Sequence, residues 1–129
     1  MKRIGQMIGA ITLSLAVQSV FAADLGQDME TLENNYELFQ ETQNTQQALT
    51  ALTAMQKAVL DAKQSIPMKL IGQPDNSPEV LGYRKALDGL NTELTQTLAL
   101  VKAGNLQQVH EQAIPAIDNM RKANHQKFR

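Results

Sequence analysis

Two residues near opposite ends of the chain, Met29 and His125, carry side chains that can coordinate one metal ion. A methionine sulfur and a histidine nitrogen are together an axial pair for haem iron, and the thioether favours the reduced state. Met29 lies near the start of a first predicted helix, and His125 lies near the end of a last one. If these two helices are antiparallel, both residues lie about 6 to 8 Å from the same end, at a rise of ~1.5 Å per residue. The pair therefore predicts a haem site between the two helices.

Apolar residues recur at intervals of three and four in four separate segments of the chain, which is the spacing of one face of an α-helix. The four segments span approximately residues 25–39, 49–66, 80–101 and 106–128. The apolar stripes consist of Leu25, Met29, Leu32, Tyr36 and Phe39, then Leu49, Leu52, Met55, Val59 and Ile66, then Val80, Tyr83, Leu87, Leu90, Leu94, Leu98 and Val101, and finally Leu106, Val109, Ala113, Ile117, Met120 and Phe128. An all-α fold of four amphipathic helices is predicted.

Helix-start signals indicate that the first and last connections between the predicted helices are short. Asn44 with Gln47, and Asn105 with Gln108, have the spacing of a capping box, with Asn in place of Ser or Thr. Gly104 is a candidate left-handed stop for the preceding helix. Short connections make consecutive helices antiparallel neighbours.

The middle connection is longer. Residues 67–77 contain two prolines, a glycine and an Asp-Asn pair without a helical pattern, so we expect an irregular loop. Ser77 before Pro78 then predicts the cap and first position of the third helix. The simplest closure is an antiparallel up-down-up-down four-helix bundle.

The amino-terminal residues are typical of an export signal. Lys2 and Arg3 precede a short apolar run over residues 8–17, and small residues end the segment. The run is shorter than the ~20 residues that span a bilayer. We therefore expect a signal peptide over residues 1–22, cleaved to leave a soluble, exported single domain over residues 23–129 that does not associate with a membrane.

The composition excludes several kinds of chemistry. The chain has no cysteine, which excludes disulfides, cysteine nucleophiles and covalently attached haem. Without Lys2 and Arg3, ten basic residues stand against thirteen acidic ones, so no basic face for nucleic acid is expected. There is no Glu-x-x-His pair of the di-iron bundles, no nucleophile elbow and no phosphate-binding glycine loop. We therefore expect a protein that is not an enzyme.

Six short segments along residues 23–129 resemble the cytochrome b562 family. They are Ala23-Asp24-Leu25, Asp28-Met29-Glu30-Thr31-Leu32, Leu60-Asp61-Ala62, Asn76-Ser77-Pro78-Glu79, Tyr83-Arg84 and His125-Gln126-Lys127-Phe128-Arg129. This family has the up-and-down bundle fold, so the fold is not independent support for the resemblance. The resemblance implies one non-covalent haem b (iron protoporphyrin IX) per chain, Met29 and His125 as axial ligands, and a periplasmic electron carrier. We expect a monomer that exchanges electrons with unidentified redox proteins.

The resemblance also implies contacts around the haem. Tyr83 and Leu87 would line one haem face, where the family has aromatic residues at both positions, so Leu87 is a departure that changes packing. Leu32 would join them in keeping the ring dry. Arg121 matches a family arginine beside the porphyrin edge, and Arg129 is a candidate neighbour of a propionate.

A second departure concerns the last helix. Between Gly104 and His125 the chain has one residue more than the family pattern, and Pro115 lies in the same interval. An interior proline removes the hydrogen bond to the carbonyl of Glu111. We expect a one-residue π-bulge near residues 111–115 to restore the helical phase before Arg121. Without it, His125 would turn by roughly 100° away from Met29.

Other interpretations of these residues stay open. Methionine on an apolar stripe is usually core filler, and a histidine near a helix C-terminus is favoured by the helix dipole without any ligand. The same bundle could serve as a haem-free periplasmic binding or stress-adaptor protein, because a fold does not fix a function. A peroxidase-like side activity would require a labile Met29. His110, about 22 Å from His125 along the helix, cannot share its metal.

Overall fold

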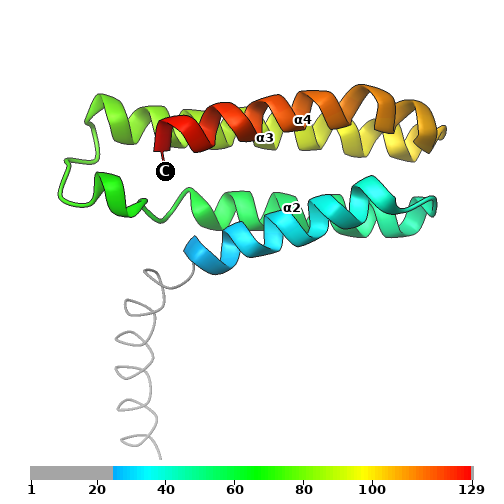
Figure 1. Ribbon diagram of the computed structural model, residues 1–129, viewed down its shortest axis with the longest axis horizontal. Coiled ribbons are helices and arrows are strands. Elements are labelled where there is room, and N and C mark those ends of the chain that lie inside the picture. The colour runs from blue at the N-terminus through cyan, green and yellow to red at the C-terminus, as the bar shows by residue number, and fades with distance from the viewer. Residues whose placement is uncertain (1–24, 129) are drawn as a thin grey trace, which may run out of the picture.

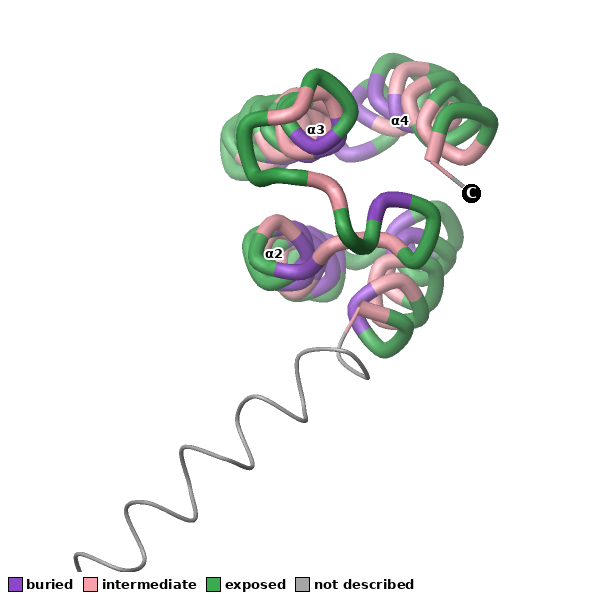
Figure 2. The backbone as a smooth tube through the Cα atoms, turned by 90° about the vertical axis from the view of Figure 1, so that its left-hand side faces the viewer, coloured by how far each residue is buried: buried purple, intermediate pink, exposed green. Residues whose placement is uncertain are grey.

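The computed structural model of the protein describes residues 25–128, which form four helices and contain no strand. The first helix is described over residues 25–41, and it is followed by α2 (Thr45–Ala62), α3 (Pro78–Ala103) and α4 (Leu106–Phe128). In Figure 1 the first helix and α2 form one layer, and α3 and α4 form the other. The end view in Figure 2 places the helices at the corners of a square, with consecutive helices adjacent. The predicted antiparallel up-down-up-down four-helix bundle is confirmed.

The caps follow the predicted residues with one change. The Asn44 side chain accepts from the backbone N–H of Gln47, and Ser77 accepts from the N–H of Val80, with Pro78 at the start of α3. The Gln47 side chain does not return to Asn44, because its oxygen accepts from the Thr42 hydroxyl at 2.7 Å. That hydroxyl oxygen in turn accepts from the Asn44 N–H at 3.0 Å.

The last connection also uses its predicted cap residues. Asn105 accepts from the Gln108 N–H at 3.2 Å. Gly104 has φ of 106° and Asn105 has φ of 62°, so two successive residues with positive φ reverse the chain between α3 and α4. The ψ of Gly104 is 179°, so the predicted stop has positive φ but is not in the left-handed helical region.

The middle connection differs from the prediction in two respects. α2 ends at Ala62, so Ile66 lies beyond the helix whose stripe it extends. Within the loop, Met68–Leu70 form a 3-10 turn, η1, although no helical pattern was evident there. Leu70 is the buried residue of this turn, and it joins the main core. One buried leucine therefore anchors a segment that the periodicity of the sequence does not reveal.

The core fills the space between the two layers. Its largest fully buried side chains include Phe39 from the first helix, Leu52 and Met55 from α2, and Leu94 from α3. α2 buries seven of its residues against the other helices, and four of these are alanines. No helix in the described part of the chain combines the length and the apolar character needed to cross a membrane.

Three contacts set the register between the first helix and α4. Arg121 forms an ion pair with Glu33. The Tyr36 hydroxyl lies 2.7 Å from the Asp118 carboxylate and 3.0 Å from the Ile114 carbonyl. Glu33 and Tyr36 are three residues apart, as are Arg121 and Asp118. The two helices therefore run antiparallel, and residues pair across them at equal steps in opposite directions.

α4 does not contain the expected π-bulge. Residues 106–128 are α-helical throughout, and Pro115 lies inside the helix on an exposed position. Glu111, whose carbonyl receives no hydrogen bond from Pro115, is also exposed, so water can solvate that carbonyl. The prediction of a bulge was wrong because a solvent-facing carbonyl does not need a change of helical pitch to be satisfied.

Candidate functional site

A cavity of about 1240 Å³ opens between the two layers at the end of the bundle that carries the start of the first helix and the end of α4. All four helices and the middle connection contribute to its walls. The six residues predicted as site residues from the sequence all line it: Met29, Leu32, Tyr83, Leu87, Arg121 and His125. The structure thus brings together side chains that are up to 96 positions apart in the chain. Their role as haem contacts stays a prediction.

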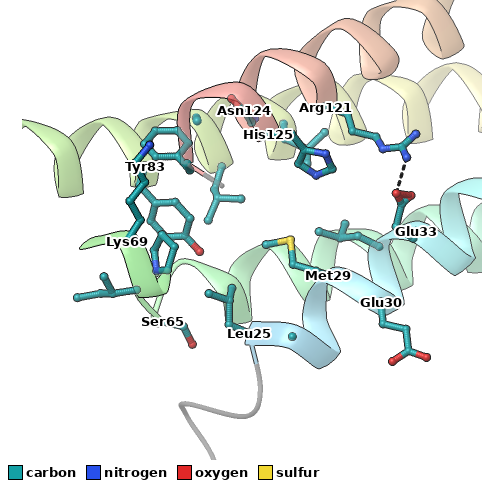
Figure 3. A pocket seen from close by; sticks show the side chains of 18 of the residues that line it. Leu25, Met29, Glu30, Glu33, Ser65, Lys69, Tyr83, Arg121, Asn124 and His125 are labelled. Carbon is teal, nitrogen blue, oxygen red and sulfur yellow. Dashed lines mark ion pairs between the residues drawn. The ribbon is translucent and has the colours of Figure 1, made fainter. Parts of the chain in front are cut away.

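Met29 and His125 project into this cavity from opposite layers, as Figure 3 shows. Glu33 lies four residues after Met29 in the first helix, and Arg121 lies four residues before His125 in α4. Because Glu33 pairs with Arg121, one turn back along the first helix and one turn forward along the antiparallel α4 place Met29 opposite His125. Both side chains are half-buried. α4 contains no bulge, yet His125 is not rotated away from Met29, and both side chains line the same cavity.

Apolar side chains make up most of the wall around this pair. Leu87 and Ile117 are buried, and Leu32 and Leu90 are half-buried against the core. Leu87, expected to alter the packing of this wall, is buried in it. These residues give the space between the thioether and the imidazole a mostly apolar lining.

Tyr83 connects three elements at the end of the cavity. Its hydroxyl donates to the Ala62 carbonyl in the last turn of α2 at 2.8 Å. Its ring lies edge-on to the ring of Phe128 on α4, with centroids 5.5 Å apart. Burial raises the pKa of Tyr83 to about 12, and the charge of Asp28 acts in the same direction. Tyr83 is therefore a neutral hydrogen-bond donor that satisfies a helix-end carbonyl and holds the carboxyl end of α4.

The charged side chains of the cavity wall are unevenly placed. The Arg121 and Glu33 side chains are about half exposed and neutralise one another at one side. Glu30 also belongs to the wall, but its carboxylate points away from Met29 in Figure 3. Lys69, from η1, lies on the other side of the Met29 and His125 pair.

Reasoning from the sequence missed the part of the wall that comes from the middle connection. Residues 64–69 and Ile71 all line the cavity, together with Asn124 and Phe128 near the end of α4. Met68 and Ile71 are unusually exposed for apolar residues, at 88% and 67%. The sequence did contain a signal for this part of the wall. The connection has four apolar residues, Ile66, Met68, Leu70 and Ile71, and apolar residues gathered in a surface loop often mark a binding site.

His110 lies outside this cavity, as expected. Its Nε2 is 2.7 Å from the Phe39 carbonyl, which can only accept, so this nitrogen donates. Its ring also packs edge-on against the Phe39 ring, with centroids 4.8 Å apart. His110 thus caps a carbonyl in the last turn of the first helix at the far end of the bundle. The hydrogen bond and the ring contact with Phe39 give His110 a structural role without any ligand.

No group of three or more His, Cys, Asp or Glu side chains suited to a metal ion occurs among residues 25–128. A metal held in this cavity would therefore depend on the thioether and imidazole pair rather than on a cluster of such groups.

Comparison with known proteins agrees with the geometry. A sequence model described as cytochrome b562 matches residues 24–129. The chain is 32% identical over 129 residues to "probable soluble cytochrome b562 1" of Yersinia pestis, covering 100% of both chains. It is 33% identical over 125 residues to "probable soluble cytochrome b562 2" of the same organism, covering 95% of this chain and 97% of the relative. A four-helix bundle with a methionine and a histidine facing each other across one cavity is thus joined to a match along almost the whole chain, and the chain belongs to the cytochrome b562 family.

Proposed function

We propose that this protein is an exported electron carrier that binds one haem b non-covalently, with Met29 and His125 as the axial ligands. The observation that carries the proposal is their placement on opposite walls of one cavity, in the register that the Glu33–Arg121 ion pair sets. Family membership supports the same cofactor.

The residues present fit this group. The cavity, at about 1240 Å³, is somewhat larger than the ~300–1,000 Å³ typical of small-molecule sites, which suits a ligand as large as a porphyrin. Its wall is mostly apolar, as the two faces of a porphyrin require. The donor set is one neutral thioether and one imidazole, and the chain has no cysteine that could form a covalent link. The ring would therefore be held by two coordinate bonds and by packing.

Haem supplies a reversible one-electron couple when it is bound. The chain's own residues decide how that couple is used. If Met29 and His125 both hold the iron, no coordination position would be left open to oxygen or peroxide, which would favour electron transfer over catalysis. The thioether of Met29 favours the reduced state. Leu32, Leu87 and Ile117, which line the cavity, would keep water from a bound ring and so strengthen that preference.

We further propose a periplasmic location and exchange of electrons with other redox proteins. The location rests on the signal-like residues 1–22, which lie outside the described residues, and on family membership. The same membership supports a role as a carrier rather than an enzyme, and we propose that the carrier is a monomer.

The decisive test is the visible absorption spectrum of the purified protein titrated with haem, oxidised and then reduced with dithionite. We expect saturation at one haem per chain and sharp reduced α and β bands of a low-spin iron. His125→Ala should abolish the low-spin spectrum, and Met29→Ala should leave a weaker, high-spin site. A pyridine assay gives the stoichiometry.

Two matched variants control for the loss of any histidine or methionine. His110→Gln changes the histidine at the far end of the bundle, and Met68→Ala changes an exposed methionine of the same cavity wall. Both should retain the low-spin spectrum. Unchanged spectra in Met29→Ala and His125→Ala would contradict the ligand assignment, and a wild-type protein without saturable binding would favour the haem-free adaptor.

A further inference from the structure

Lys69 lines the haem-binding cavity from η1, in the connection that closes the end of the bundle. Four of the lining side chains other than His125 carry a formal charge: Glu30, Glu33, Lys69 and Arg121. The last of these is neutralised by Glu33. Among residues 25–128, Lys69 is therefore the cavity cation without an ion-pair partner, and it remains available to a ligand.

Haem has two propionate carboxylates on one edge of its ring. A ring coordinated between Met29 and His125 would have Arg121 on one side and Lys69 of η1 on the other, because Figure 3 shows these two basic residues on opposite sides of the pair. On the Arg121 side, the carboxylates would meet Glu33 and disrupt an existing ion pair. On the η1 side, they would meet an unpaired ammonium group. The other nearby acid, Asp28, is buried and does not line the cavity.

We propose that Lys69 binds the propionate carboxylates of the haem, so that the carboxylate edge faces the connection formed by residues 65–71. This inference rests on the proposed function, because it requires haem between Met29 and His125. It assigns a binding role to a loop residue and fixes which edge of the ring lies at the end of the bundle. It also leaves the Glu33–Arg121 pair intact in the complex.

The test compares Lys69→Gln with wild type for two ligands, haem and haem dimethyl ester, whose carboxylates carry no charge. The measurement is the rate of transfer of each ligand to an excess of a haem-scavenging globin. For haem, Lys69→Gln should accelerate dissociation by about two- to fivefold, as expected for a partly exposed ion pair. For the ester, the two proteins should release the ligand at the same rate. The acceleration should shrink at high ionic strength.

Two further variants sharpen the comparison. Lys57→Gln removes the same charge from an exposed position of α2 that does not line the cavity, and it should leave both rates unchanged. Arg121→Gln should change the rates for haem and the ester by the same factor. Circular dichroism should show the wild-type helix content in every variant, because Lys69 and Lys57 are exposed.

The outcomes separate this inference from the proposed function. Equal effects of Lys69→Gln on haem and the ester, or no effect beyond that of Lys57→Gln, would overturn the role of Lys69 while leaving the haem site intact. A charge-dependent effect confined to Arg121→Gln would place the propionates at the opposite edge and overturn it as well. A wild-type protein that binds neither ligand would overturn both proposals.

Discussion

The Tyr36 hydroxyl of the first helix lies 2.7 Å from the Asp118 carboxylate of α4. Three pairs of residues follow one another along the two antiparallel helices, from the middle of the bundle toward the cavity. Tyr36 with Asp118 is the first pair, Glu33 with Arg121 is the second, and Met29 opposite His125 is the third. The two proposed ligands therefore face each other because the polar contacts above them fix the register. A change in those contacts tests how strongly the site depends on the bundle that holds it.

The hydrogen bond between Tyr36 and Asp118 should contribute measurably to stability. Tyr36→Phe should lower the free energy of unfolding by about 1–2 kcal/mol, because a donor to a charged acceptor is lost in a partly buried site. Urea unfolding of the haem-free protein measures the loss. Asp118→Asn should cost less in the Tyr36→Phe background than in wild type. Strict additivity of the two substitutions would show that the pair is not coupled.

Stability should fall steeply in strongly alkaline solution. Burial raises the pKa of Tyr83 to about 12 and also raises that of Tyr36, with Asp118 adding to the effect at Tyr36. A folded-state pKa above the unfolded value near 10 means that the neutral phenol favours the folded state. This stabilisation is fully present below pH ~10 and is lost as the pH rises from about 10 to about 12. The limiting slope is about 1.4 kcal/mol per pH unit for each tyrosine.

Unfolding of the haem-free protein by urea between pH 8 and pH 12 measures this slope. Tyr83→Phe should be less stable at pH 8, because the Ala62 carbonyl loses its donor, but its stability should fall less between pH 10 and 12. Lysine titration is common to both proteins and cancels in the comparison. Parallel pH profiles for wild type and Tyr83→Phe would contradict the assignment.

The charge of Glu33 should influence the reduction potential of a haem bound in the cavity. Glu33→Gln removes a negative charge beside the site and leaves Arg121 without its partner, and both changes disfavour the more positive ferric state. The potential should therefore rise, while the free energy of unfolding falls by less than about 1 kcal/mol, because the ion pair is half exposed. Potentiometric titration of the haem-loaded protein measures the change.

Glu37→Gln provides the matched control, since it lies one turn further along the first helix, is exposed and does not line the cavity. Its effect on the potential should be smaller and should disappear at high ionic strength. An equal rise in both variants would mean that net charge, rather than the Glu33–Arg121 pair, sets the potential.

Replacing Pro115 should stabilise α4 without altering the site. Pro115→Ala restores the hydrogen bond to the Glu111 carbonyl, which should raise the free energy of unfolding by about 1–2 kcal/mol after the greater freedom of the unfolded chain is allowed for. The haem spectrum should not change, because α4 is already α-helical and His125 already lines the cavity. Urea unfolding and reduced visible spectra measure the two effects.

Gln112→Ala, a surface substitution in the same turn, reports the ordinary effect of helix propensity, which should be only a few tenths of a kcal/mol. A shift of the haem bands in Pro115→Ala alone would show that the proline does set the orientation of His125. In that case the helix would have to change pitch or direction when the proline is removed.

Much of the fold is encoded locally and could be predicted. The three- and four-residue spacing of apolar side chains predicts the four helices, and the caps at Asn44, Ser77 and Asn105 predict where three of them start. Short connections then require antiparallel neighbours. These features depend on residues within a few positions of each other, so hydrogen bonding and burial of one helix face are sufficient to specify them. The same logic places Met29 and His125 at one end of the bundle.

Only the tertiary structure decides what surrounds that pair. The connection of residues 65–71 has no helical spacing of apolar residues from which its structure could be predicted. Its position depends on the burial of Leu70 in the core and on the distance that it must span between α2 and α3. The sequence alone therefore does not show that Lys69 belongs to the cavity. Likewise, the carbonyls of Ala62 and Phe39 are satisfied by Tyr83 and His110 from the opposite layer, through contacts that no local pattern reveals.

The last helix shows the same division. The sequence determined that Pro115 removes a backbone donor, but only the tertiary structure placed Glu111 and Pro115 at exposed positions, where water can solvate the Glu111 carbonyl. A carbonyl that water can reach does not force a bulge, so α4 keeps its pitch to the end. Sequence thus determined that the chain has a thioether and an imidazole suited to a haem iron. Long-range packing decided that Met29 and His125 share one cavity and which charged groups surround them.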